Sequence, residues 1–465
     1  MTVPCLLISG VSSGVGKTTV MVGLAHALRT RGLTVAVFKC GPDYLDPTYH
    51  RRVAGRVCHN LDGWMMGRQA VLDTFERGSR GADIALIEGV MGLFDGASPT
   101  GEEGSTAEIA KWLGAPVVLV VDVSGMARTI AAVAHGFASF DRNLAVAGLV
   151  CNRVGSRGHL SLLQQTVCAA PIFGGFPKAP NETFPTRHLG LHAANEGVSN
   201  DLLSGWGQRA EDWFDIDMML RSATDAVAGA STVTPALASE AREDLSKRPT
   251  CRIGLAWDDA FSFYYEDNLA RLESLGVELV RFSPLSDREL PDVDGLYLGG
   301  GYPEVFARRL SENRSMRASI EMFAASGGPV YAECGGLMYL TRMIVDFSGS
   351  RFPMVGLIPA EAILSEKRRA LGYVEVETQA DSLLGPAGIR FRGHEYRYSS
   401  LSEIDGDRMN LYRIKKRRGG TVTWEGYQVD NVVATYVHAH WASNPEVAEN
   451  FVEACRDFLN RECVL

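Results

Sequence analysis

Short, almost wholly apolar segments alternate with amphipathic stretches along most of this chain. In the first 221 residues the apolar segments are 4–9, 34–39, 84–88, 117–123 and 145–151. A strand that is apolar along its whole length is covered on both faces, which is typical of parallel sheets flanked by helices. The pattern therefore predicts an α/β domain that binds its ligands at the carboxyl ends of the strands.

The alternation stops and then resumes. Residues 223–250 are rich in Ala, Ser and Thr, so we interpret them as a linker. Strands are expected again at 252–256, 278–282, 295–298 and 329–332. Shorter strands, a Gly419-Gly420 turn and a final helix over 445–460 then predict an antiparallel extension. A chain of 465 residues exceeds one core, and we predict domains at 1–222 and 251–465 joined by 223–250.

Composition excludes several classes of protein. A net charge of −9 argues against a general nucleic-acid or anionic-membrane binder, so we expect neither partner. The longest apolar runs are too short to span a bilayer, and no basic segment marks a signal peptide. The nine cysteines are scattered and lack zinc-site spacing, which favours reduced thiols. We expect a cytoplasmic protein.

A glycine-rich loop joins the first apolar segment to a helix over 18–31. It reads Gly10-Val-Ser-Ser-Gly-Val-Gly-Lys-Thr-Thr19, and such a loop presents backbone N–H groups to phosphate. The residues predicted to contact a nucleotide are Ser12, Ser13, Gly14, Val15, Gly16, Lys17, Thr18 and Thr19. The spacing departs from a strict Walker motif, because Val11 stands where the first glycine is expected. A tight turn with a solvated lysine is the alternative.

Charged residues follow the neighbouring strands. Lys39 ends the second strand and is expected to contact the nucleotide, and the nearby acids are Asp43, Asp46, Glu88 and Asp95. Acids at strand ends beside a phosphate loop can hold Mg²⁺ and orient an attacking oxygen, with Thr18, Asp43 and Glu88 as the predicted metal ligands. The alternative for each acid alone is a helix cap or a turn residue.

A cysteine occupies a second strand-to-helix turn. Cys334 follows the strand at 329–332 and precedes two glycines, so the helix N-terminus is expected to lower its pKa. The N–H of Gly335 and the loop Gly299-Gly300-Gly301 are the predicted oxyanion donors. His438 is the candidate base. A buried, inert cysteine is the alternative.

Two sets of motifs resemble known families. Residues 299–304, residues 332–338 and His438 are similar to class I glutamine amidotransferase domains. The segments 39–47, 88–96, 187–191, 261–265 and 393–396 narrow the resemblance further. With them the whole chain resembles the cobyrinic acid a,c-diamide synthase family of the cobalamin pathway.

The resemblance implies a fold and a reaction. The fold would be an N-terminal P-loop NTPase-like domain of the dethiobiotin-synthetase type, followed by a glutaminase domain. Cys334 and His438 would release ammonia from glutamine, and MgATP would phosphorylate the c- and a-acetate carboxylates of the macrocycle. Ammonia would then displace phosphate. Lys17, Thr18 and the four acids would form the synthetase centre, and a homodimer is one possible assembly.

Two departures and three alternatives stay open. His440 stands where ordinary class I glutaminases carry a glutamate, and Arg397 stands where the resembled family has histidine, which leaves substrate choice open. Hydrogenobyrinic acid or a (nickel-)sirohydrochlorin are alternative tetrapyrrole-derived polycarboxylates for the same chemistry. A P-loop ATPase with a non-catalytic, glutaminase-like binding module is the third alternative.

Overall fold

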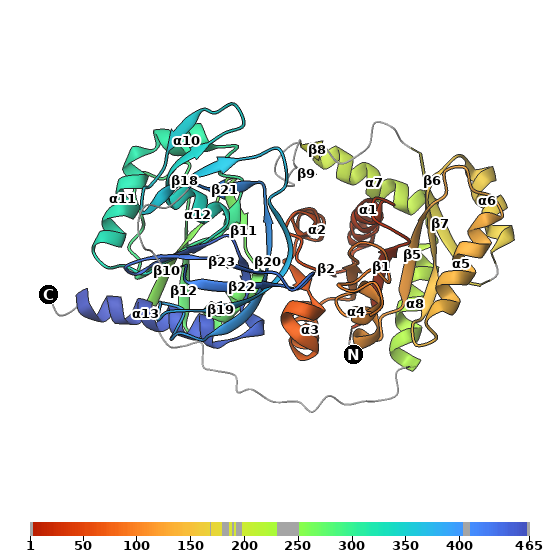
Figure 1. The fold of residues 1–465 in the computed structure, drawn as a ribbon. Helices are drawn as coiled ribbons and strands as arrows, with labels where there is room; N and C mark the ends of the chain where they lie inside the picture. Colours follow the sequence, from red (N-terminus) through yellow and green to blue (C-terminus); the bar gives the residue numbers. More distant parts are fainter. Residues whose placement is uncertain are drawn as a thin grey trace. The chain divides into compact units, whose positions relative to one another are not determined.

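The computed structural model describes residues 3–167, 169–178, 186–187, 190–191, 198–229, 251–402 and 410–462. The chain separates into two compact units, Met1–Glu240 and Ala241–Leu465 (Figure 1). Each unit is described by itself.

A parallel sheet forms the centre of the first unit. Its seven strands lie in the order β3-β2-β4-β1-β5-β6-β7. The strands are β1 (Cys5–Gly10), β2 (Val35–Cys40), β3 (Cys58–Leu61), β4 (Ile84–Glu88), β5 (Val117–Asp122), β6 (Val146–Val154) and β7 (Ile172–Pro177). The five strands predicted from the sequence are confirmed within a few residues. The strands β3 and β7 were missed, because the first contains His59 and Asn60 and the second contains two adjacent glycines.

Helices cover both faces of this sheet. They are α1 (Lys17–Thr30), α2 (Asp46–Ala54), α3 (Gly63–Ser79), α4 (Thr106–Leu113), α5 (Thr129–Phe140), α6 (Arg157–Thr166), α7 (Asn200–Trp213) and α8 (Ile216–Gly229), and a short pair β8 (Thr186–Arg187) and β9 (Gly190–Leu191) lies between α6 and α7 in the sequence. Val35 and Val37 of β2 pack into the cluster that contains α1, whereas Phe38 packs against Phe75 of α3 with ring centroids 5.0 Å apart. Successive side chains of one strand therefore reach opposite helical layers.

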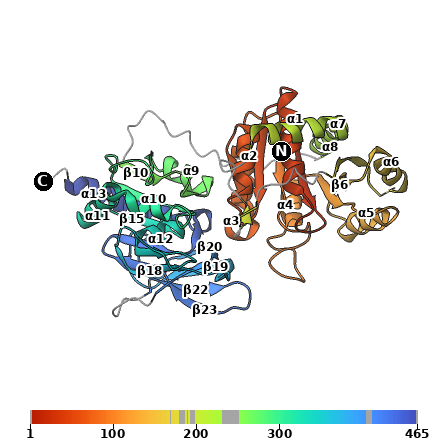
Figure 2. The same ribbon diagram turned by 90° about the horizontal axis from the view of Figure 1, so that it is seen from above.

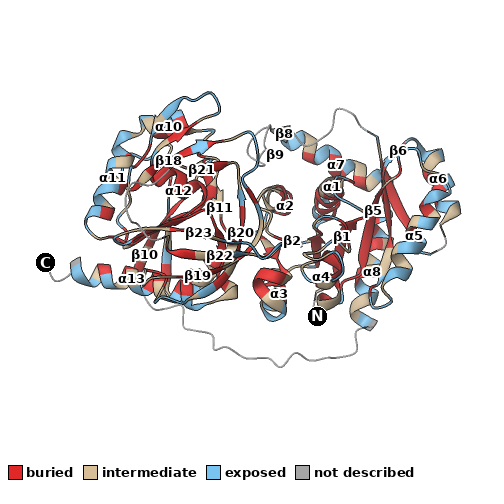
Figure 3. Ribbon diagram, viewed as in Figure 1, coloured by how far each residue is buried: buried red, intermediate tan, exposed pale blue. Residues whose placement is uncertain are grey.

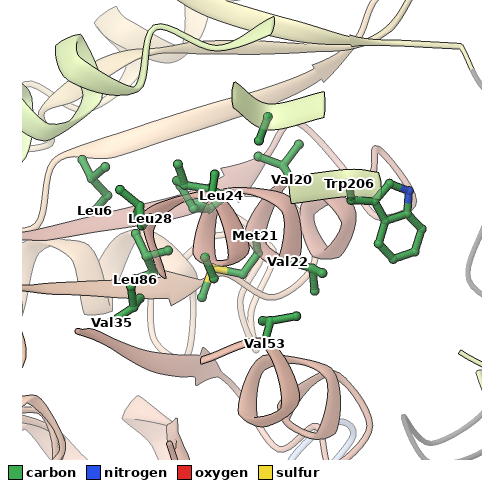
Figure 4. Packing of buried hydrophobic residues seen from close by; sticks show 14 of the residues in the cluster. Leu6, Val20, Met21, Val22, Leu24, Leu28, Val35, Val53, Leu86 and Trp206 are labelled. Carbon is green, nitrogen blue, oxygen red and sulfur yellow. The ribbon is translucent and has the colours of Figure 1, made fainter. Parts of the chain in front are cut away.

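Helix α1 is buried on nearly all sides. Seen from above, it lies beside α7 on one face of the sheet (Figure 2). In the close view, Leu24 and Leu28 lie among strand side chains, Val53 of α2 lies near Val22, and Trp206 comes from α7 (Figure 4). Each such side chain contributes about 1.5–3 kcal/mol on burial. This packing holds the helix whose first turn follows the glycine loop.

The predicted domain boundary falls within the last helix of this unit. Helix α8 continues to Gly229, and Ala223 is buried in the same core as α1. The residues from 230 to 250 lie outside the described part of the chain.

The second unit also has a central, mainly parallel sheet. Its order is β12-β10-β13-β15-β25-β24, and only the edge strand β24 runs antiparallel to its neighbour. The strands are β10 (Cys251–Ala256), β12 (Val277–Phe282), β13 (Gly295–Leu298), β15 (Val330–Glu333), β24 (Tyr427–Val429) and β25 (Val432–Thr435). The helices are α9 (Glu266–Ser274), α10 (Ala307–Glu312), α11 (Arg314–Ala325), α12 (Gly335–Leu340), η1 (Trp441–Ser443) and α13 (Glu446–Glu462). The strands and the terminal helix predicted here are confirmed within two residues.

An antiparallel extension completes the second unit, as the sequence predicts. The order β23-β22-β19-β20-β26 contains β19 (Ala370–Thr378), β20 (Arg390–Arg397), β22 (Tyr412–Lys416), β23 (Val422–Glu425) and β26 (His438–His440). The turn with Gly419 and Gly420 joins β22 to β23. The remaining strands are β11 (Phe261–Phe263), β14 (Gly300–Gly301), β16 (Thr341–Val345), β17 (Arg351–Pro353), β18 (Ile358–Leu364) and β21 (Ser399–Leu401).

Burial follows the layers. Sheet strands are mostly buried and the outward faces of the helices are exposed (Figure 3). The cysteines of the described residues are free and buried. Trp64, Met65 and Met66 at the start of α3 are core residues.

Candidate active site

The glycine loop lies at the carboxyl edge of the first sheet. It connects β1 to α1, and Gly16 caps the helix with a φ of 95°, a conformation that glycine adopts without strain. Strand β6, which is separated from β1 by β5 in the sheet, anchors the loop, because Asn152 Nδ2 donates to Val15 O at 2.8 Å. Ser12, Ser13 and Gly14 are exposed. Lys17 Nζ donates to Ser12 O at 3.2 Å and to Met91 O at 2.6 Å, which folds its side chain back along the loop.

A buried ionic network lies beside this loop at the ends of β2 and β4. Lys39 Nζ is 2.5 Å from Asp46 Oδ2 and 2.9 Å from Glu88 Oε1. Thr18 donates its hydroxyl to the same Oε1 atom at 2.9 Å, and His50 Nε2 is 2.6 Å from Glu88 Oε2. The structure therefore brings Thr18, Lys39, Asp46 and Glu88 together.

Electrostatics explains how these charges coexist in a buried place. Burial opposes the charge of Lys39, but Asp46 and Glu88 outweigh it and raise the pKa of Lys39 well above its usual value. Burial likewise opposes the charge of Glu88, but Lys39 and His50 hold the pKa of Glu88 well below its usual value. Burial and the nearby Asp43 raise the pKa of Asp46. Burial and Lys39 lower the pKa of Lys17.

The other two acids make backbone contacts. Asp43 Oδ1 accepts from the N–H groups of Leu45, at 2.7 Å, and Asp46, at 3.3 Å. Asp95 Oδ2 accepts from Gly92 N–H at 2.9 Å. Both contacts match the turn-residue alternative. The charges of both acids still act on the network, since Asp43 contributes to the pKa of Lys39 and Asp95 to that of Lys17.

Sequence reasoning missed two residues of this centre. His50 lies on α2 and is fully buried against Glu88. Asn152 lies near the end of β6, where it contacts the glycine loop. Asn152 follows the apolar stretch predicted as a strand at 145–151, and Lys39 and Glu88 likewise stand at strand ends, so the position of Asn152 was a usable signal. His50 gave no such signal.

The donor set suits Mg²⁺. A threonine hydroxyl and a carboxylate that share one contact are the oxygen ligands this ion prefers. Among the described residues, no group of three His, Cys, Asp or Glu side chains forms a complete metal site. Mg²⁺ commonly binds through one or two protein oxygens together with nucleotide phosphates, so the residues fit a nucleotide-borne ion.

The thiol site lies at the carboxyl edge of the second sheet. The strands β13, β15 and β25 are neighbours there, and their ends lead to Gly299, Cys334 and His438 respectively. Cys334 has φ 48° and ψ −97°, an uncommon conformation for a residue with a side chain, and caps α12. Its N–H donates to Thr435 O at 2.7 Å, and its Sγ lies 3.9 Å from Tyr396 O.

Glycines bring the three loops of this site together. A Cβ atom on Gly300 would lie 2.4 Å from His438 Cε1, so the loop packs directly on the ring. A Cβ atom on Gly336 would lie 2.2 Å from Leu298 O, so only glycine lets α12 start this close to β13. A Cβ atom on Gly335 would lie 3.0 Å from Gly301 N. Cys334, the loop of Gly299, Gly300 and Gly301, and His438 therefore belong to one site.

The hydrogen bonds of this loop show which of the predicted oxyanion donors already have an acceptor. The N–H of Gly299 donates to Tyr264 Oη at 2.8 Å and its carbonyl accepts from Gly336 N–H at 3.0 Å. Gly299 therefore stabilises the strand-to-helix turn at Cys334. The N–H of Gly335 hydrogen-bonds the sulfur of Cys334. Gly300 and Gly301 are the remaining candidates for an oxyanion donor in this loop.

The protonation states differ from expectation. Burial raises the pKa of Cys334 to about 12 and outweighs the lowering by the Gly335 N–H at the start of α12, so the predicted net fall in this pKa is wrong. Burial also lowers the pKa of His438 to about 3. The site therefore holds a neutral thiol and a neutral imidazole, which is the state from which a base can accept the thiol proton.

Arg397 lies close to the thiol. It follows Tyr396, its guanidinium stacks on Tyr436 with 4.2 Å to the ring centroid, and its Nη1 donates to Ser399 O at 2.8 Å. Its charge lowers the pKa of Cys334 slightly against the effect of burial. His188 and the side chain of Arg187, both from the motif at 187–191, lie outside the described residues.

Each of the two units matches a known domain family. Residues 6–180 match the CobQ/CobB/MinD/ParA nucleotide binding domain, and residues 252–446 match the CobB/CobQ-like glutamine amidotransferase domain. Cobyrinate a,c-diamide synthase of Leptospira interrogans is 50% identical over 455 residues, which cover 97% of this chain and 98% of that protein. The chain belongs to the cobyrinate a,c-diamide synthase family.

Other members of the family match over the same length. The protein of that name from Syntrophotalea carbinolica is 46% identical over 98% of this chain and 99% of its own length. The one from Methanosarcina acetivorans is 40% identical over 98% of this chain and 96% of its own length. The resemblance drawn from the motifs and the predicted fold class, a nucleotide-binding α/β domain followed by a glutamine amidotransferase domain, are confirmed. Within the described residues, no helix is long and apolar enough to cross a bilayer.

Proposed function

We propose that this member of the cobyrinate a,c-diamide synthase family uses ATP and glutamine to amidate the a- and c-acetate carboxylates of cobyrinic acid. The observation that carries the proposal is the pairing of two built sites in one chain. One joins Thr18, Lys39 and Glu88 beside a phosphate loop, and the other joins Cys334 and His438 beside a glycine loop.

The thiol site supplies ammonia. His438 takes the proton of Cys334 while Sγ attacks the side-chain amide carbon of glutamine, and Gly300 or Gly301 stabilises the developing oxyanion. The proton passes to the leaving nitrogen, the C–N bond breaks, and ammonia leaves a thioester. Water then releases glutamate and restores the thiol.

The synthetase centre supplies an activated carboxylate. A carboxylate is a poor electrophile, so its oxygen attacks the γ-phosphorus of ATP to give an acyl phosphate and ADP. Lys17 neutralises charge on the phosphates, and Lys39 adds positive charge beside the loop while it pairs with Asp46 and Glu88. Thr18 and Glu88, with Asp43 nearby, would hold Mg²⁺, and that ion would add positive charge at the phosphates. Ammonia displaces phosphate and forms the amide, once for each acetate.

Product mass spectrometry tests this proposal. Purified enzyme receives ATP, Mg²⁺ and glutamine with cobyrinic acid, hydrogenobyrinic acid or a sirohydrochlorin in separate reactions. We expect a diamide from cobyrinic acid, accompanied by two ADP and two glutamate for each product molecule. A diamide from another macrocycle alone would reassign the substrate. ATP hydrolysis without any amide product would favour the ATPase with a non-catalytic binding module.

A further inference from the structure

A buried glutamate precedes the nucleophile in the chain and lies beside the base of the thiol site. Glu333 ends β15, immediately before Cys334, and is 1% exposed. Its Oε1 accepts from Tyr331 Oη at 2.8 Å and from Ala439 N–H at 3.1 Å. Its Oε2 accepts from Tyr297 Oη at 3.1 Å and lies 3.9 Å from His438 Nδ1. The carboxylate is therefore fixed by three donors and directed at one ring nitrogen of the base.

The strand that carries His438, β26, has no acidic residue of its own that could orient the ring. Position 440 is a histidine, whose ring packs at a tilt against Tyr265 with centroids 4.6 Å apart, and burial lowers the pKa of His440 to about 4. On the other side, the ring of His394 stacks on His438 with centroids 4.9 Å apart, and burial lowers the pKa of His394 well below its usual value. Both flanking histidines are therefore neutral.

The remaining groups around Glu333 are tyrosines. Four of them face it, namely Tyr264 before α9, Tyr297 of β13, Tyr331 of β15 and Tyr412 of β22. Burial raises the pKa of each. They donate hydrogen bonds or pack without carrying charge. Among the described residues named around the ring of His438, Glu333 is the acid, and its carboxylate can bear a negative charge.

We propose that Glu333 is the positioning residue for His438 in glutamine hydrolysis, and this rests on the proposed function of the thiol site. Its carboxylate selects the tautomer with the proton on Nδ1, so that Nε2 is left to take the thiol proton. The imidazolium that forms is stabilised by the same carboxylate. The 3.9 Å separation shortens as the ring becomes charged, since such contacts are often long in the free enzyme.

A neighbouring glutamate provides a matched control. Glu425 of β23 is also buried, and it accepts from Thr435 Oγ1 at 2.6 Å and from Tyr436 N–H at 2.7 Å. Burial raises the pKa of Glu333 and of Glu425 to about 7. Both residues brace the segment around β25, but only Glu333 faces the ring of His438.

The experiment compares Glu333→Gln, Glu333→Asp and Glu425→Gln in the full-length chain. It measures kcat and KM for glutamine hydrolysis, and the rate of Cys334 alkylation by iodoacetamide from pH 6 to pH 10. For Glu333→Gln we expect kcat to fall about 100-fold with KM within about threefold. The alkylation rate should fall about tenfold at each pH in this range, because the charged imidazole loses its partner. A direct effect of Glu333 on the thiol would act the other way, since the charge of Glu333 raises the pKa of Cys334. Glu333→Asp should show smaller changes in the same direction.

The control variant separates positioning from a merely structural role. Glu425→Gln should keep kcat within about threefold and leave the alkylation profile unchanged. An equal loss in Glu425→Gln, or an unchanged alkylation profile in Glu333→Gln, would overturn the proposal. Failure of the proposed function would instead appear as no glutamine hydrolysis by the unmodified protein. The alkylation profiles would still decide on Glu333 in that case.

Discussion

At the scale of single residues, Glu88 makes three contacts from one buried carboxylate, to Thr18, Lys39 and His50. The variant Glu88→Gln keeps the shape but removes the charge that balances Lys39. We expect ammonia-dependent amidation to fall by at least about 100-fold, because the charges around the phosphates are no longer arranged for transfer.

Glutamine hydrolysis is the control for this variant, since Cys334 and His438 belong to the other unit. It should stay within about twofold of the unmodified rate. Steady-state assays with ammonium salts and with glutamine measure the two rates separately. Ammonia-dependent amidation near the unmodified rate in Glu88→Gln would contradict the role of Glu88.

A second residue-scale prediction concerns pH and stability. The pKa of Glu425 is about 7 in the folded chain and near 4.5 when unfolded. Between these values the unfolded chain releases a proton that the folded chain keeps, so this residue lowers the free energy of unfolding as pH rises through the window. Glu425→Gln removes that effect.

Relative to the unmodified protein, the variant should therefore gain stability from pH 5 to pH 8, by up to about 3 kcal/mol. Urea unfolding of both proteins at the two pH values measures the change. A difference in unfolding free energy that is the same at pH 5 and pH 8 would rule out a raised pKa for Glu425.

At the scale of elements, the thiol site depends on how closely three loops approach one another. In Gly300→Ala, the new Cβ atom would lie 2.4 Å from His438 Cε1, which is too close without a shift of the ring. We expect glutamine hydrolysis to fall about 100-fold, because a displacement of about 1 Å at a catalytic group has that effect. Ammonia-dependent amidation should persist.

The matched variant is Gly295→Ala at the opposite end of β13. Its Cβ atom would lie 2.3 Å from Cys455 Sγ, a contact as severe as that at Gly300 but remote from His438. This variant should lose stability in urea unfolding and keep hydrolysis within about threefold. Equal losses of hydrolysis in both variants would show that general destabilisation, and not the position of His438, explains the effect.

Elements with a strong apolar period could be predicted from the sequence, and weaker ones could not. The strand β13 was predicted at its observed bounds because all its residues are apolar or small, whereas β3 contains two polar residues and was missed. Cys334 could be placed on a turn because glycines follow it. Its protonation could not be predicted, because the burial that raises its pKa comes from strands far away in the sequence.

At the scale of the whole molecule, the chain has two compact units, each with its own core and its own site at a sheet edge. The motifs predicted which strand ends carry each site, since adjacent loops of a parallel sheet share one edge. They did not predict His50 or the position of Glu333 against His438, because those contacts depend on packing between layers. The backbone contacts of Asp43 and Asp95 could not be predicted from the motifs either, because they depend on how the turns fold.

The division of labour between the two units is the central claim, and Cys334→Ser tests it most directly. Amide formation on cobyrinic acid is followed by mass spectrometry, first with glutamine and then with ammonium salts as the nitrogen source. We expect glutamine-dependent amidation to disappear, because serine cannot form the thioester at this site, and ammonia-dependent amidation to continue near the unmodified rate. Loss of both activities, or survival of both, would contradict two sites that share one reaction.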